Sequence, residues 1–179
     1  PPPPSFEWVG AFALADATHT WSMQAVDGVY ADASMRLVLI PTDAPTAATI
    51  ESLEDQGASL ITGDSCTVVE AGESMGAPGA AGSCFELHAG TGIDSLYTID
   101  TTGLSGFVVF AQHSPLEFER DRHYLFDSLD ADVEPTAQES AGGDHGHDHS
   151  HGPPPPSFEW VGAFALADAT HTWSMQAVD

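Results

Sequence analysis

ATHTWSMQA, residues 17–25, alternates two kinds of side chain along the chain. One set, on alternate positions, is Ala17, His19, Trp21, Met23 and Ala25. A repeat of two is the period of a β-strand, and large side chains on one face favour burial of that face. The stretch therefore predicts a half-buried strand. His19 and Met23 could suit copper, although a core role is commoner on an apolar strand face.

The sequence on both sides continues this β character. Phe6 to Leu14 is apolar with one glycine, and MRLVLI (35–40) reads as a central strand. Further short strands are expected at 59–62, 66–70, 84–88, 95–99 and 107–112, the last two as a pair. Turn residues separate them every eight to twelve positions, which is typical of an all-β protein. We predict a β-sandwich of Greek-key type, similar to immunoglobulin or cupredoxin folds.

The remaining segments carry weaker signals. Residues 47–55 predict one short helix, with Thr46 as its N-cap and Gly57 ending it. Residues 116–126 are expected to be irregular. Residues 130–140 are acidic and broken by proline, which is typical of a tail.

The charge is strongly negative. Lys and Arg together number 3 against 27 acids, and the formal net charge is −24. Nucleic-acid binding requires cations that displace counterions from phosphates, so a nucleic-acid partner is excluded. No uncharged apolar run approaches the roughly 20 residues of a membrane span. The chain begins without Met or a signal peptide, so we expect a mature or trimmed product.

Cys66 and Cys84 lie in two predicted strands joined by a loop rich in Gly, Ala and Pro. A disulfide between them would stabilise the fold by roughly 3 kcal/mol. Such a bond implies an oxidising compartment, so we expect an extracellular or periplasmic protein. The alternative is two free buried thiols.

Residues 153–179 repeat residues 1–27 letter for letter. The repeated stretch holds two strand-like segments that need a sheet to pack on, because a two-stranded unit alone is marginal in water. We predict that a sheet accepts the copy by strand exchange, in the same chain or in a neighbour. The side chains expected to carry the exchange are Phe158, Trp160, Phe164, Trp173 and Met175. The alternatives are an engineered self-complementing strand, a fragment of a tandem array, or an overhang.

DHGHDHSH, residues 144–151, places four histidines at alternate positions: His145, His147, His149 and His151. Imidazole is a good ligand for Zn and Cu, and the neighbouring carboxylates attract cations. Such tracts read as metal-binding, with binding that weakens below about pH 6.5 as the imidazoles protonate. The alternative is an affinity tag.

A second group of candidate ligands follows the last apolar strand. His113, Glu117 and Glu119 come from one loop, with His123 close behind, and His88 ends another strand. One histidine and two carboxylates supply most of a Zn or Cu site. The alternative is that His113 caps the strand and the glutamates are solvated.

Enzyme motifs are weak. Gly63-Asp64-Ser65 resembles a serine-protease nucleophile loop, but Cys66 follows where glycine is needed. A blue-copper centre is disfavoured, because no cysteine lies in the His113 loop. We predict that the chain is not an enzyme.

Several motifs together resemble a little-characterised group of bacterial extracytoplasmic proteins. They are Glu7-Trp8-x-Gly10-x-Phe12, Thr20-Trp21-Ser22, Asp27-Gly28-x-Tyr30-Ala31-Asp32, His113-x-Pro115-x-Glu117-Phe118 and Val133-Glu134-Pro135. Members of this group end in His/Asp-rich tails and are linked to transition-metal handling. The resemblance implies metal binding through His113, Glu117 and the tail.

These observations predict three parts: a β-sandwich domain (1–140), a Gly/His/Asp/Pro linker (141–156) and the duplicated strand segment (157–179). The expected function is extracytoplasmic binding of Zn or Cu, with copies of the chain linked head to tail. The alternative is a structural fibre subunit in which metal only stiffens the junction.

Overall fold

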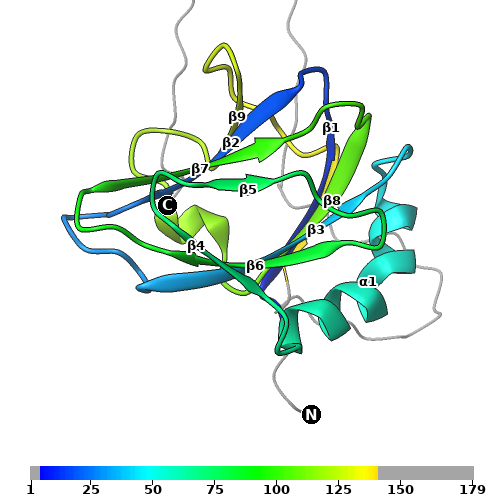
Figure 1. The fold of residues 1–179 in the computed structure, drawn as a ribbon, viewed down its shortest axis with the longest axis horizontal. Coiled ribbons are helices and arrows are strands. Elements are labelled where there is room, and N and C mark those ends of the chain that lie inside the picture. Colours follow the sequence, from blue (N-terminus) through cyan, green and yellow to red (C-terminus); the bar gives the residue numbers. More distant parts are fainter. Residues whose placement is uncertain (1–4, 141–179) are drawn as a thin grey trace, which may run out of the picture. The chain divides into compact units, whose positions relative to one another are not determined.

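A computed structural model describes residues 5–140, and in this range the fold belongs to the predicted all-β class. Two β-sheets pack face to face, and one α-helix covers the outer face of the larger sheet (Figure 1). The predicted linker and the repeated segment lie outside the described residues.

The larger sheet has six strands. In spatial order they are β10 (Ala137–Ser140), β1 (Trp8–Ala13), β8 (Gly106–Ala111), β3 (Ser34–Pro41), β6 (Ser83–His88) and β4 (Thr67–Glu70). All neighbouring pairs are antiparallel except β4 with β6. The repeated stretch therefore supplies an internal strand of this sheet, between β10 and β8.

The smaller sheet has four strands. Their order is β5 (Ser74–Gly76), β7 (Asp94–Asp100), β2 (Thr18–Gln24) and β9 (Leu125–Asp127). The predicted alternation of β2 holds at its start, and Trp21 and Met23 are completely buried as expected, but Ser22 and Gln24 on the opposite face are buried as well. The predicted pair of 95–99 with 107–112 is wrong: β7 pairs with β2 and β5, whereas β8 belongs to the other sheet.

Two apolar layers hold these elements together. The first lies between the sheets and contains Trp8, Phe12, Trp21, Leu37 and Tyr97, among others. The second lies between the larger sheet and the helix. Because the larger sheet is covered on both faces, its central strands are continuous apolar runs rather than alternating ones.

The helix α1 (Ala47–Thr62) has 16 residues and extends well beyond the predicted end at residue 55. Thr46 caps it as predicted. Gly57 does not end it. A Cβ atom on Gly57 would lie 2.6 Å from the ring of Phe110, so this glycine permits close packing of helix on sheet. The predicted strand at 59–62 is consequently wrong, since these residues form the last helical turn.

The predicted disulfide forms between Cys66 and Cys84. It joins the residue before β4 to β6, two strands that are neighbours in the larger sheet. The loop between the cysteines also contains β5, which the sequence did not indicate.

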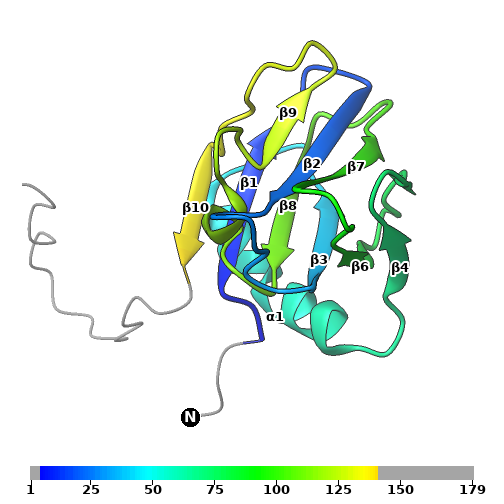
Figure 2. The same ribbon diagram turned by 90° about the vertical axis from the view of Figure 1, so that its left-hand side faces the viewer.

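The end of the described domain is more regular than predicted. Residues 116–126, expected to be irregular, carry the end of the 3₁₀ helix η1 (Pro115–Phe118) and the start of β9. Residues 137–140 form β10 rather than a free tail, and β10 lies antiparallel beside β1 (Figure 2). The indole N–H of Trp8 donates to the Gln138 side chain and fixes this edge strand. Among the described residues, no helix is long and apolar enough to cross a membrane.

Candidate metal centre

Three described side chains lie close enough together to hold a metal ion: Glu7, His113 and Glu117. Strand pairing brings the first two together. The backbone N–H of Glu7 donates to the carbonyl of Ala111, at the end of β8, and His113 follows two residues later. One ligand atom of each of the three side chains lies within 4.8 Å of the others.

The turn after β8 brings Glu117 to the same place. Its buried anchors are Pro115 and Phe118, on the 3₁₀ helix η1. The backbone N–H of Glu117 donates to the Ser114 carbonyl, and the Ser114 N–H donates to a Glu7 carboxylate oxygen at 3.2 Å. The loop is therefore tied to Glu7, and Glu117 projects from it.

The His113 ring lies between two carboxylates. Its Nδ1 is 3.8 Å from Glu7 Oε2, and its Nε2 is 3.5 Å from Asp32 Oδ2. Both distances exceed those of a well-formed hydrogen bond, which are about 2.7–3.2 Å. The imidazole is partly buried while the carboxylates are exposed, so acidic oxygens can move on both sides of the ring.

The donor set suits a borderline transition ion. One imidazole with two carboxylates equals in number the ligands of three-ligand zinc sites that keep a position open for water. Ligand atoms of a tetrahedral zinc lie about 3.4 Å apart, given bonds of about 2.0–2.1 Å. Glu7 and Glu117 must therefore close by roughly an ångström, which their exposed side chains permit. Asp32 could orient the imidazole through its other nitrogen.

The other predicted ligands of the described domain fall into separate groups. Glu119 pairs with His123, whose Nδ1 lies 2.6 Å from Glu119 Oε1. His88 lies between Glu70 and Glu86. His145, His147, His149 and His151 lie outside the described residues, as do Phe158, Trp160, Phe164, Trp173 and Met175.

His88 lies between two carboxylates, and each of its ring nitrogens contacts one of them. Its Nδ1 is 3.0 Å from a Glu70 oxygen and its Nε2 is 3.3 Å from a Glu86 oxygen. The hydrogen bonds to Glu86 and then to Glu70 raise the pKa of His88. Glu86 also accepts from Arg36 at 3.2 Å, and the bonds from His88 and Arg36 lower the pKa of Glu86. Both ring nitrogens are thus engaged, and a metal would have to displace a carboxylate.

His19 and Met23, weighed as copper ligands, belong to the core. Met23 is completely buried and His19 is 1% exposed. The Thr101 hydroxyl donates to the Asp16 carbonyl, so its oxygen accepts from Nδ1–H of His19 at 2.8 Å. Burial lowers the pKa of His19. The imidazole therefore acts as a neutral, hydrogen-bonded core residue.

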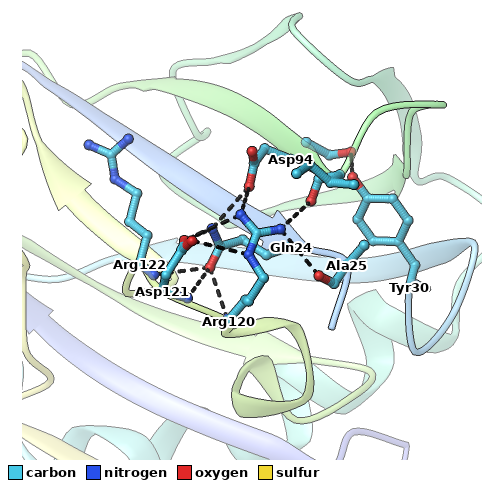
Figure 3. Close-up of polar contacts among 9 residues, drawn as sticks. Gln24, Ala25, Tyr30, Asp94, Arg120, Asp121 and Arg122 are labelled. Carbon is cyan, nitrogen blue, oxygen red and sulfur yellow. Dashed lines mark hydrogen bonds and ion pairs between the residues drawn. The ribbon is translucent and has the colours of Figure 1, made fainter. Parts of the chain in front are cut away.

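The loop that carries Glu119 and His123 is anchored on β2 by Gln24 (Figure 3). The Gln24 side-chain oxygen accepts three consecutive backbone N–H groups, from Arg120, Asp121 and Arg122, at 2.9–3.1 Å. Its amide nitrogen donates to Asp94 and Asp121. This buried amide fixes the backbone of the loop and, with it, the starting positions of Glu119 and His123.

Sequence reasoning missed two members of the His113 group, Glu7 and Asp32. Both are distant from His113 in the chain, and only the pairing of β1 with β8 brings Glu7 to it. Local spacing signals a ligand pair such as His113 and Glu117, but it carries no information about this pairing.

No protein-family model, no curated protein and no solved structure matches this chain.

Proposed function

We propose that the chain is an extracytoplasmic binding protein for a divalent transition ion, Zn²⁺ or Cu²⁺. The observation that carries this proposal is the convergence of Glu7, His113 and Glu117. These residues come from two ends of paired strands and a turn, and each offers an oxygen or nitrogen that these ions accept.

The geometry favours uptake and release over a structural role. Three protein ligands leave positions open to water, and two of the three side chains are exposed. Closed four-ligand sites stabilise folds, whereas open ones exchange ligands. The net charge of −24 raises the local cation concentration around such a site.

Two further features support the proposal. The sequence from Asp144 to His151 adds four imidazoles and two carboxylates, which increases the number of ions one chain can take. The Cys66–Cys84 disulfide supports an oxidising compartment, where such a bond persists.

Titration calorimetry of the full chain with Zn²⁺ and Cu²⁺ tests this function. We expect His113→Ala to remove one class of binding sites, and Glu117→Gln to weaken that class at least tenfold. A variant with the four tail histidines changed to Ala should lose a different class. Glu51→Gln, an exposed carboxylate on α1, is the matched control and should change neither.

Three results would count against the proposal. Unchanged stoichiometry and affinity in His113→Ala would show that the Glu7, His113 and Glu117 cluster does not bind the ion. The same result in the variant that lacks the four tail histidines would show that the tail does not bind the ion. Because metals bind neutral imidazole, a binding isotherm that is unaffected by acid pH would also contradict it.

A structural role is the second candidate, and the position of the repeated stretch favours it. Residues 8–24 provide β1 and β2, one internal strand in each sheet. Their large side chains Trp8, Phe12, Trp21 and Met23 are buried between the sheets. The copy carries the same side chains, so it suits the same place in a neighbouring molecule, and such head-to-tail contacts build a filament.

Sedimentation velocity over a wide range of concentrations tests the filament. We expect larger species as concentration rises, and a return to monomer in Phe164→Asp, because a charge would then occupy the place of a buried ring. Thr170→Ser, at a position that corresponds to the exposed Thr18 in the first copy, is the control. A monomer at every concentration would exclude the filament.

A further inference from the structure

We propose a second divalent-cation site, in which His123 and Glu134 are ligands and Glu119 orients the imidazole. This site is separate from the Glu7, His113 and Glu117 cluster. It depends on one buried ring nitrogen of His123, and it does not require that the first cluster binds a metal.

The His123 ring is held in one orientation. Its Nδ1 lies 2.6 Å from Glu119 Oε1, and the same oxygen accepts the Tyr124 backbone N–H at 3.2 Å. The ring lies against Tyr124, with the ring centroids 3.9 Å apart and the ring planes tilted by 41°. A carboxylate oxygen can only accept, so Nδ1 carries the hydrogen, and the neutral ring presents its Nε2 lone pair on the other side. Carboxylate–histidine pairs of this kind orient metal-binding imidazoles.

That second nitrogen lacks a partner in the described domain. Nε2 of His123 is buried and makes no hydrogen bond there. The facing group is the Glu134 carboxylate, 3.9 Å away and beyond hydrogen-bond distance. A buried polar atom left without a partner is unfavourable, because it has lost its hydrogen bonds to water. An ion between the nitrogen and the carboxylate would satisfy both.

The spacing fits a metal. A Zn–N bond of about 2.0–2.1 Å and a Zn–O bond of about 2.0–2.2 Å together exceed the observed 3.9 Å, so one ion can contact both atoms. The Glu134 side chain is 74% exposed and can approach further to give a tetrahedral angle.

His123 also lines an open surface cavity of about 270 Å³. It is lined by Glu119, Arg120, Asp121, Arg122, His123 and Asp132. With two protein ligands, water would complete the coordination of an ion held by His123 and Glu134.

The two arginines at the cavity do not make it a cation-repelling site. Arg120 pairs with Asp94 at 3.0 Å and with Asp121 at 3.1 Å. Arg122 pairs with Asp130 at 2.5 Å and lies over the Phe126 ring. Each guanidinium is therefore neutralised by nearby carboxylates, and Glu134 is left to face the ion.

The test isolates this site in the full chain. The background variant replaces His113 and the four tail histidines by Ala, which removes the other proposed imidazole ligands. Calorimetric titration of this variant with Zn²⁺ should show one site. We expect His123→Ala to abolish it, Glu134→Gln to weaken it at least tenfold, and Glu119→Gln to weaken it 10–100-fold. His88→Ala, a histidine held by two other carboxylates, should leave binding unchanged.

The substitution at Glu134 keeps the test decisive if His123→Ala disturbs folding, because Glu134 is mostly exposed. Absence of Zn²⁺ binding in the background variant would overturn the proposal. So would binding that survives both His123→Ala and Glu134→Gln. Loss of binding in His113→Ala alone concerns the first cluster and leaves this site untouched.

Discussion

At the scale of single residues, three histidines of the described domain show how surroundings decide what an imidazole does. Burial lowers the pKa of His19 and keeps it a neutral donor in the core. Two carboxylates raise the pKa of His88. His123 has one carboxylate on Nδ1 and an unpartnered Nε2. Composition alone counts these residues together, although only the last is arranged as a ligand.

The raised pKa of His88 predicts that this side chain stabilises the fold more at low pH than at high pH. Its ordinary value is 6.5, so the ion pairs stabilise the fold fully below about pH 6.5 and are lost as pH rises through the raised pKa. The side chain is 36% exposed, so the contribution is at most about 1 kcal/mol. We expect urea unfolding of the parent chain and His88→Gln to differ most at pH 6 and least at pH 9. A difference that is constant over this range would contradict the assignment.

At the scale of elements, strands with one polar face were the easiest to predict. β7 alternates between exposed and buried residues throughout, whereas β2 alternates only at its start, because Ser22 and Gln24 are also buried. Gly57 was misread because a glycine that lets a helix approach Phe110 looks, in sequence, like one that ends a helix. β10 gave no apolar signal, because its burial alternates between partly buried and exposed at the edge of the sheet.

The sequence also predicted only part of the candidate metal centre. His113 and Glu117 lie four residues apart, and the loop after an apolar strand is a common place for ligands. Glu7 joins them only because β1 pairs with β8, which depends on how the whole larger sheet is ordered. Equally, the separation of Glu119 and His123 from His113 follows from the turn of η1 and the Gln24 anchor.

At the scale of the whole molecule, the chain contains two identical stretches. The described domain has one place for such a stretch, the positions of β1 and β2. That place runs through both sheets, so a seated stretch can leave only if the internal strands β1 and β2 both separate from their neighbours. Such an opening approaches global unfolding in cost. The chain also leaves the described domain beside the start of β1, because Ser140 pairs with Trp8. Either stretch could therefore fill the place during folding, at similar free energy.

This equivalence predicts a specific pattern of thermal stability. Trp21 is completely buried, and a Trp→Ala change in a core costs about 3–5 kcal/mol. If residues 158–176 can replace 6–24, Trp21→Ala in the full chain should melt close to the parent, as should its counterpart Trp173→Ala. The double variant should lose the full amount, because neither stretch then fits.

Phe12→Leu and Phe164→Leu, singly and together, repeat the comparison with a milder change. Differential scanning calorimetry at two protein concentrations separates the routes of rescue. A rescue independent of concentration means that the chain fills its own place, whereas a rescue that strengthens with concentration means that a neighbour does. If Trp21→Ala is as unstable as the double variant, the second stretch does not enter this fold, and the repeat must serve another purpose.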